Sequence, residues 1–315
     1  MMNYDVFKEV VTEKFMDYMP SQYEEMKLMI CPIKKVNVTL DGMSLVGDGD
    51  FTVTPTIYIN DMFVDYQKTN DLLEVLRTAA SQMEHAMKES LEIVPVIDFN
   101  TAKNNIVFQL VNTEQNKDML QDTPNRSFLD LSIIYRWVVK SDVEGIQSIV
   151  IHNSLAERLS LSEKQMFKLA EENTRRILPP TVKSMNDILR TMFKNDVIPA
   201  EIADIMISEM PPEQTMWVIS NDCGINGAIS ILYEDKLHMV AEQLESDLYI
   251  LPSSIHEAIA VSTSMGNPNE LAQMVTDINM EQVALSERLS NNVYHYDKNL
   301  RKLLLATDIS DKGFS

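Results

Sequence analysis

The segment Leu251 to Glu257 brings a nucleophile, a base and a carboxylate close together in the chain, as Ser253, Ser254, His256 and Glu257. Serine, histidine and carboxylate side chains are the groups that hydrolases and acyl transferases use for nucleophilic catalysis. Catalytic triads normally take their members from separate elements, however, and no GxSxG elbow surrounds these serines. We therefore predict a structural turn between two strands, whose hydroxyls bond to backbone N–H groups. A hydrolase or transferase that uses these four residues is the alternative.

Metal and cofactor chemistry has little support in the sequence. None of the histidines lies in an H-E-x-x-H pattern, and the pair His238 and Glu242, four residues apart, is expected to be a solvated surface pair. Cys31 and Cys223 are far apart and belong to no CxxC motif, which favours reduced thiols. The CGING segment at Gly224 and Gly227 lacks the third glycine and the lysine of a phosphate loop. We expect no metal ion and no cofactor.

Two further polar clusters have a simple structural interpretation. In the sequence His152-Asn153-Ser154, Asn153 or Ser154 is expected to cap the following helix. The pair Arg175 and Arg176 is expected to place positive charge at a helix C-terminus, where it interacts favourably with the helix dipole. Neither cluster predicts a ligand.

The composition limits the classes of partner. The 315 residues include 47 acidic and 27 basic side chains, so the formal net charge is −20 and the surface repels phosphate backbones and anionic lipids. Residues 1–11 do not read as a secretory signal, and no segment has the roughly 18 consecutive apolar residues of a membrane span. We expect a cytoplasmic protein that binds neither nucleic acid nor membranes directly, with another protein as its partner.

The N-terminal part predicts the order helix, three strands, helix. Apolar residues spaced by three and four over 4–18 indicate an opening helix, which Pro20 ends. Alternation over 36–40 followed by Asp41-Gly42 predicts a hairpin that turns at those two residues, and alternation at 51–59 predicts a third strand. Asn70 is expected to cap a long helix with its core stripe between 72 and 87.

The C-terminal part predicts strands separated by helices, after a short helix at Asp98 and a polar boundary at 116–126. Ser162 with Gln165, Ser184 with Asp187, and Asn267-Pro268 each indicate the start of a helix. Two more helices are predicted, one around Ile202, Ile205 and Met206 and one over 237–244. Strands are predicted at 131–139, 146–151, 216–220, 228–232, 248–251 and 258–261, with a closing hairpin at 293–296 and 303–305.

These elements define an α+β fold, with antiparallel or mixed sheets packed against several helices in one large domain or two closely packed domains. We predict an N-terminal α/β unit over residues 1–120 and a C-terminal α+β unit over 121–315. In the second unit, we expect one sheet to bury a set of apolar residues: Ile134, Ile149, Val150, Val218, Leu248 and Ile250.

Several segments resemble one bacterial family. They include the opening YDVFKEVV, the strand PTIYIND, FLDLSIIYR, IHNS, FKLAEENTRRILPP, SDLYILPSSIHEAI, NPNELAQMVTDIN and NVYHYD, and they span residues 4 to about 305. The family is the domain-of-unknown-function family numbered five-six-eight-eight, found mostly in gut-dwelling Gram-positive bacteria and often near mobile-element genes. The resemblance implies a cytoplasmic bacterial protein whose presence depends on the lifestyle of the bacterium, and it provides no catalytic or ligand-binding residue.

We therefore predict a non-enzymatic interaction or regulatory protein of an accessory or mobile element, because the chain has a large core but no convergent set of titratable residues. A special form of this hypothesis is an acidic mimic of nucleic acid that occupies the basic groove of another protein. The hydrolase or transferase that uses Ser253, Ser254, His256 and Glu257 remains the alternative.

Overall fold

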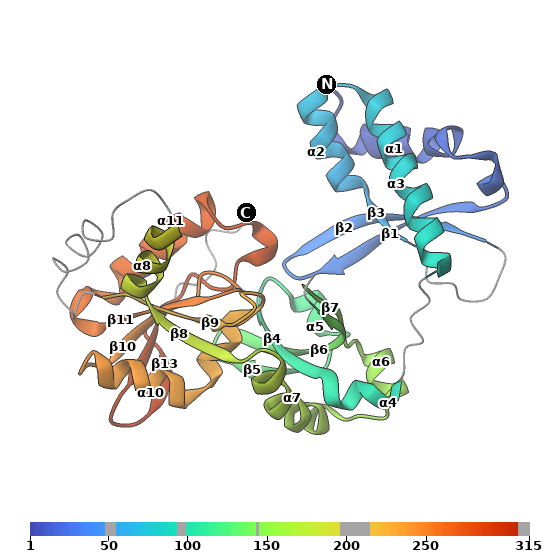
Figure 1. Cartoon of the computed structure of the whole chain (residues 1–315). Helices are drawn as coiled ribbons and strands as arrows, with labels where there is room; N and C mark the ends of the chain where they lie inside the picture. The colour runs from blue at the N-terminus through green and yellow to red at the C-terminus, as the bar shows by residue number, and fades with distance from the viewer. Residues whose placement is uncertain (48–54, 93–98, 143–144, 196–214, 308–315) are drawn as a thin grey trace. The chain divides into compact units, whose positions relative to one another are not determined.

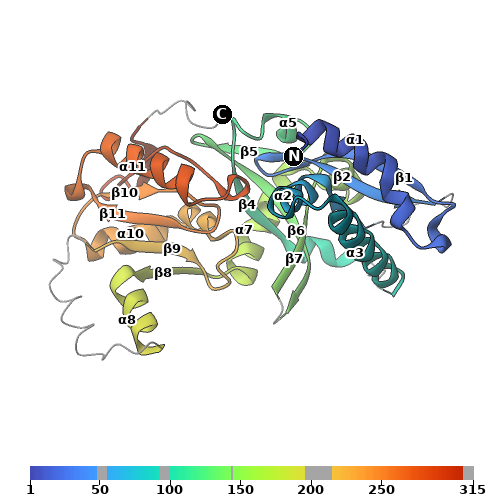
Figure 2. The same ribbon diagram turned by 90° about the horizontal axis from the view of Figure 1, so that it is seen from above.

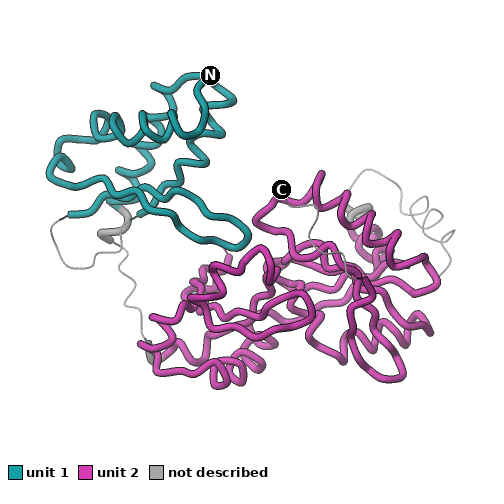
Figure 3. Tube along the Cα trace, turned by 180° about the vertical axis from the view of Figure 1, so that it is seen from behind, with its two compact units in different colours: residues 1–97 teal, residues 98–315 magenta. Residues whose placement is uncertain are grey.

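The computed structural model describes residues 1–47, 55–92, 99–142, 145–195 and 215–307. The chain divides into two compact units, residues 1–97 and 98–315 (Figures 1 and 3). The described residues form helices and three antiparallel sheets, which confirms the α+β class. None of the helices in this part of the chain combines the length and the hydrophobicity that crossing a membrane requires.

The N-terminal unit packs three helices against a three-stranded sheet of order β1-β2-β3. Its core holds Phe7, Phe15, Met43, Leu45 and Met83, all of which are fully buried. Phe7 also stacks on the Tyr66 ring, with 5.3 Å between the ring centroids. The elements are α1 (Tyr4–Lys14), short 3₁₀ turns at Phe15–Tyr18 and Ser21–Tyr23, β1 (Lys27–Lys35), β2 (Val38–Val46), β3 (Ile57–Tyr58), α2 (Ile59–Thr69) and α3 (Leu72–Glu92).

The hairpin turn predicted at Asp41-Gly42 is wrong. The chain reverses at Val36 and Asn37, where Asn37 takes the left-handed φ of 60°, and Gly42 pairs with Cys31 inside the ladder. A Cβ on Gly42 would lie 2.2 Å from Ile33 Cδ1, so this glycine permits a close side-chain approach across the strands instead of a turn.

The prediction for residues 51–70 is also corrected. Residues 51 and 53 lie outside the described part, and the third strand is limited to Ile57–Tyr58, because Ile59 already begins α2. Asn70 ends α2 in the left-handed conformation, with φ of 53°, instead of capping the next helix. The cap of α3 is Asp71, whose Oδ1 accepts a hydrogen bond from the Glu74 N–H at 3.0 Å.

The C-terminal unit begins with a four-stranded sheet. Strand β6 (Leu131–Asp142) pairs with β4 (Ile106–Asn112), β5 (Asn125–Phe128) and β7 (Gly145–Val150). The antiparallel pairing of β6 with β7 confirms the predicted pairing of 131–139 with 146–151. Helix α7 (Glu163–Ile177) packs on β4 and β6, and the predicted Ser162 and Gln165 capping box is confirmed. The short helices α4 (Phe99–Ala102), α5 (Lys117–Leu120) and α6 (Asn153–Arg158) complete this part.

The rest of the unit is built on a six-stranded sheet of order β13-β12-β10-β11-β9-β8. Figure 2 labels four of its strands, β8, β9, β10 and β11. In Figure 1, α10 lies on one face of this sheet and α11 on the other, and the buried Ala272 and Val275 of α11 pack against Leu251 and Val261. The bounds are β8 (Pro180–Ser184), α8 (Met185–Asn195), β9 (Trp217–Asn221), α10 (Glu234–Gln243), β10 (Leu248–Leu251), β11 (Ala258–Ser262), α11 (Pro268–Glu281), β12 (Tyr294–Asp297) and β13 (Lys302–Leu305). The predicted Asn267 cap and the closing hairpin are confirmed.

Three expectations for this unit differ from the structure. The apolar residues expected in one sheet lie in two sheets, and Ile149 is 40% exposed. The strand predicted at 228–232 is the buried 3₁₀ helix Gly227–Leu232, which lies between the two sheets and contacts β4 and β9. The strand β4, which the sequence prediction did not identify, pairs with β6 and so belongs with residues 98–315, whereas the predicted boundary at 120 assigns it to the first unit. The helix predicted around Ile202 lies outside the described residues.

Candidate functional site

The segment that contains Ser253, Ser254, His256 and Glu257 connects β10 to β11 and is held in place by the chain at 287–290. Backbone hydrogen bonds join Ile255 N to Glu287 O at 2.8 Å and Leu289 N to Ser253 O at 2.9 Å. Ser254 and Arg288 form an isolated β-bridge. The turn is therefore fixed on both sides by main-chain contacts.

Two polar side chains of this turn, those of Ser254 and His256, bond to the backbone. Ser254 is 6% exposed, and its Oγ accepts a hydrogen bond from the His256 N–H at 3.0 Å. His256 Nδ1 accepts a hydrogen bond from the Asn226 N–H at 3.3 Å, so a neutral imidazole carries its proton on Nε2. His256 Nε2 in turn lies 3.6 Å from Glu287 Oε1.

The geometry does not couple a serine hydroxyl to the imidazole. A nucleophilic serine needs its hydroxyl within hydrogen-bond reach of the base. Within the described residues the His256 ring bonds to Asn226 and approaches Glu287, while the side chains of Ser253 and Glu257 make no hydrogen bond or ion pair. The structure thus joins Ser254 to His256 through the backbone and leaves Ser253 and Glu257 outside the arrangement.

A chain of polar side chains, not predicted from the sequence, links this turn to the four-stranded sheet. Gln109, 3% exposed on β4, donates from Nε2 to Asn226 Oδ1 at 3.2 Å. The half-buried Arg136 on β6 donates to Gln109 Oε1 at 3.1 Å and also to Ser148. These residues lie far apart in the sequence and have no common motif, so no local signal could have identified them.

The other clusters considered from the sequence have structural roles. His152 is the residue that precedes α6, so the predicted cap at Asn153 or Ser154 is wrong by one or two positions. His238 and Glu242 lie 3.7 Å apart, and only the glutamate is exposed, because the histidine is half-buried. Arg175 and Arg176 do lie in the last turn of α7. Across the parts of the chain that the structure describes, no three His, Cys, Asp or Glu side chains gather as metal ligands.

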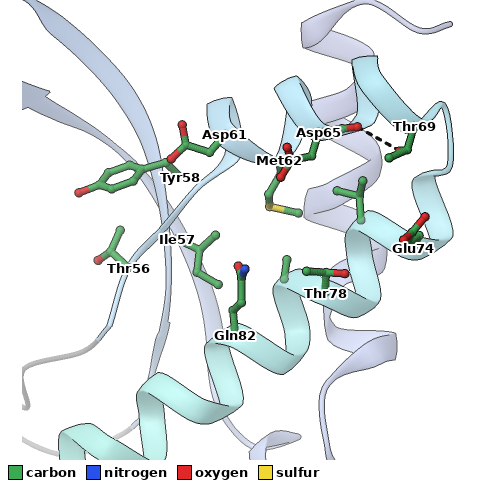
Figure 4. Close-up of a pocket in the computed structure, with 12 residues that line it drawn as sticks. Thr56, Ile57, Tyr58, Asp61, Met62, Asp65, Thr69, Glu74, Thr78 and Gln82 are labelled. Carbon is green, nitrogen blue, oxygen red and sulfur yellow. Dashed lines mark hydrogen bonds between the residues drawn. The ribbon is translucent and has the colours of Figure 1, made fainter. Parts of the chain in front are cut away.

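A second candidate site is a groove of about 520 Å³ in the N-terminal unit, between β3, α2 and α3 (Figure 4). Four apolar side chains form part of its lining: Ile57, Met62, Val75 and Ala79. Three carboxylates also line it, those of Asp61, Asp65 and Glu74, and Asp65 is paired with Lys68 at 3.2 Å. Among the described residues that line the groove there is no serine, cysteine or histidine, and its hydroxyl groups come from Tyr58 and three threonines, Thr56, Thr69 and Thr78.

The fold and these sites define an α+β protein in which the polar residues of the His256 turn are held by main-chain contacts. Comparison with known families matches residues 4–298 to the family of unknown function DUF5688. The chain belongs to this family, which confirms the resemblance of its segments. The searches for similar proteins found no significant match among curated proteins or among solved structures.

Proposed function

We propose that this protein is a non-enzymatic interaction or regulatory protein, and that it acts for an accessory or mobile element of its host. The observation that carries the proposal is the use of Ser254 and His256 in hydrogen bonds to main-chain N–H groups. In this segment Ser254 and His256 hold a turn, and no serine hydroxyl is hydrogen-bonded to the imidazole, so an activated serine has no geometric basis here.

The groove between β3, α2 and α3 is the surface on which we expect a protein partner to bind. Apolar side chains such as Ile57 and Met62 provide contact area that a partner can bury. The carboxylates of Asp61 and Glu74 form no ion pair with a described residue, so they can accept hydrogen bonds from a partner. A partner segment with apolar and basic side chains fits this combination.

Site-specific photocrosslinking in the native host tests the proposal. Benzoyl-phenylalanine replaces Thr78, which is exposed and lines the groove. In a matched control it replaces Thr12, which is also exposed, on α1, but lies outside the groove. We expect one defined protein to crosslink at position 78 and not at position 12. The purified chain, treated with a fluorophosphonate probe for active serines, should remain unlabelled.

The opposite pattern would favour the enzyme. Labelling of Ser253 or Ser254 by the fluorophosphonate, lost when His256 is replaced by alanine, would identify a hydrolase or transferase. Equal crosslinking at positions 78 and 12 would mean that the groove is not the partner surface.

A further inference from the structure

A cavity of about 300 Å³ in the C-terminal unit lies between the four-stranded sheet, α7 and the 3₁₀ helix Gly227–Leu232. Three of its lining residues, Phe167, Glu171 and Arg175, are spaced by four along α7 and therefore lie on one face of the helix. Aromatic rings from β4, β5, α7 and the start of α10 also line it: Phe108, Phe128, Phe167 and Tyr233. Four of the ten lining residues are thus aromatic, and three, Arg126, Glu171 and Arg175, are charged.

Two arginines hold their guanidinium groups in fixed positions on these walls. Arg126 Cζ lies 3.6 Å from the centre of the Phe167 ring, and its Nε and Nη2 donate to the two carboxylate oxygens of Glu163 at 3.0 and 3.1 Å. Arg175 Cζ lies 4.1 Å from the centre of the Tyr233 ring, and its Nη2 donates to Asp235 at 2.8 Å. Within the described structure, Nη1 of Arg126 and both Nε and Nη1 of Arg175 have no hydrogen-bond acceptor.

Glu171 supplies an acceptor at the same cavity. Its side chain lines the cavity together with Arg126 and Arg175, yet it forms no hydrogen bond or ion pair with any described residue. The cavity therefore offers unused donors, an unused carboxylate and aromatic walls together. The nearby charged groups are two arginines and three carboxylates, those of Glu163, Glu171 and Asp235, so the site does not favour a phosphate group.

We propose that this cavity binds a planar heteroaromatic base of the guanine type, as a free base or nucleoside. Such a base stacks on aromatic rings and on guanidinium planes. Guanine O6 and N7 are acceptors for arginine N–H groups, and the N1–H and N2–H₂ groups of the same ring are donors that a carboxylate can accept. The proposal goes beyond the interaction role above, since a protein partner does not require it.

Isothermal titration of the full chain with guanosine, adenosine, cytidine, guanosine 5′-monophosphate and tryptophan tests the site. A ligand of this size with ordinary efficiency should bind with a Kd on the order of 100 μM. We expect guanosine to bind at least about tenfold more tightly than adenosine or cytidine, because a site built for a donor and acceptor pattern rejects rings that lack it. The monophosphate should bind no more tightly than guanosine.

Two neighbouring glutamates on α7 provide a matched pair of variants. Glu171→Gln removes the carboxylate at the cavity, whereas Glu172→Gln makes the same charge change at an exposed residue that does not line it. Guanosine affinity should fall about tenfold or more in Glu171→Gln and stay unchanged in Glu172→Gln.

Four results would overturn the proposal. They are no guanosine binding up to millimolar concentration, equal affinity for all three nucleosides, tighter binding of tryptophan, or equal loss of affinity in the two glutamine variants. Thermal unfolding of both variants checks that a loss of affinity does not come from a loss of fold.

Discussion

Replacing Ser254 by alanine separates the structural role of the His256 turn from a catalytic one. The substitution removes the Oγ that accepts the His256 N–H at 3.0 Å, in a position that is only 6% exposed. Ser253→Ala is the matched control, because the hydroxyl of Ser253 makes no hydrogen bond in the described part of the chain. The structure thus assigns different roles to two adjacent serines.

The size of the effect follows from this one hydrogen bond. Losing the acceptor and leaving a desolvated N–H costs about 1 to 2 kcal/mol. For a unit of about 200 residues, this corresponds to a fall in the unfolding temperature of about 2 to 8 °C. Ser253→Ala should change the free energy of unfolding by less than about 0.5 kcal/mol, because Ser253 is only half-buried and no hydrogen bond of its hydroxyl is lost.

Tryptophan fluorescence is the suitable assay. Both tryptophans of the chain, Trp137 and Trp217, lie in the C-terminal unit, so their emission follows the unfolding of that unit alone. Urea titrations of the parent and the two variants give the free-energy differences. An unchanged midpoint in Ser254→Ala, together with fluorophosphonate labelling of the parent that this variant loses, would refute the structural interpretation.

Substitutions at three other sites, Gly227, Asp130 and Glu234, test particular contacts. Gly227→Ala should destabilise the C-terminal unit by about 2 kcal/mol or more, since the added Cβ would lie 2.2 Å from Ser220 Oγ and 2.3 Å from His256 O. The control Gly224→Ala, at a position with φ of +64° and open space around it, should cost about 1 kcal/mol in the same urea assay. Asp130→Ala should lower the free energy of unfolding by about 3 kcal/mol or more, because Asp130 accepts hydrogen bonds from Ser290 Oγ, Asn292 Nδ2 and the hydroxyl of the fully buried Tyr294. A double-mutant cycle with Tyr294→Phe should show a coupling energy of about 1 to 3 kcal/mol. Hydrogen bonds from Arg301 and Tyr296 hold the pKa of Glu234 below its usual value of 4.5, so its contribution is complete above that pH and is lost as the pH falls toward the lowered value. Glu234→Gln should therefore be less stable than the parent by up to about 1 kcal/mol at neutral pH, and the two unfolding midpoints should converge in acid; a constant difference down to the lowest pH would contradict this.

Local signals along the chain were enough to predict several helices and strands. The Ser162 and Gln165 capping box and the Asn267-Pro268 cap predicted α7 and α11, because the atoms that satisfy a helix end lie within three residues of it. The runs at 131–139 and 146–151 predicted an antiparallel pair, because so short a link leaves few other arrangements.

The turn at Asn37 and the conformation of residues 228–232 depend on contacts with residues that are distant in the sequence, so local signals did not predict them. Asp41-Gly42 has the local signature of a turn, but the approach of Ile33 and Thr56 requires a glycine inside the strand, and Asn37 makes the turn instead. Residues 228–232 have a strand-like apolar composition, but they lie between two sheets and form a 3₁₀ helix there.

In the candidate sites, too, the sequence shows which residues are neighbours along the chain, and the fold decides which side chains meet. The sequence places Ser254 beside His256, but only the fold shows that the serine accepts the histidine N–H and that Asn226, which bonds the ring, comes from a segment 30 residues away. The cavity with Arg126, Glu171 and Arg175 likewise combines a strand and a helix that no sequence motif connects. Composition and spacing determine which local elements form, whereas a site is set by the direction of side chains from different elements, and that direction exists only after those elements have packed.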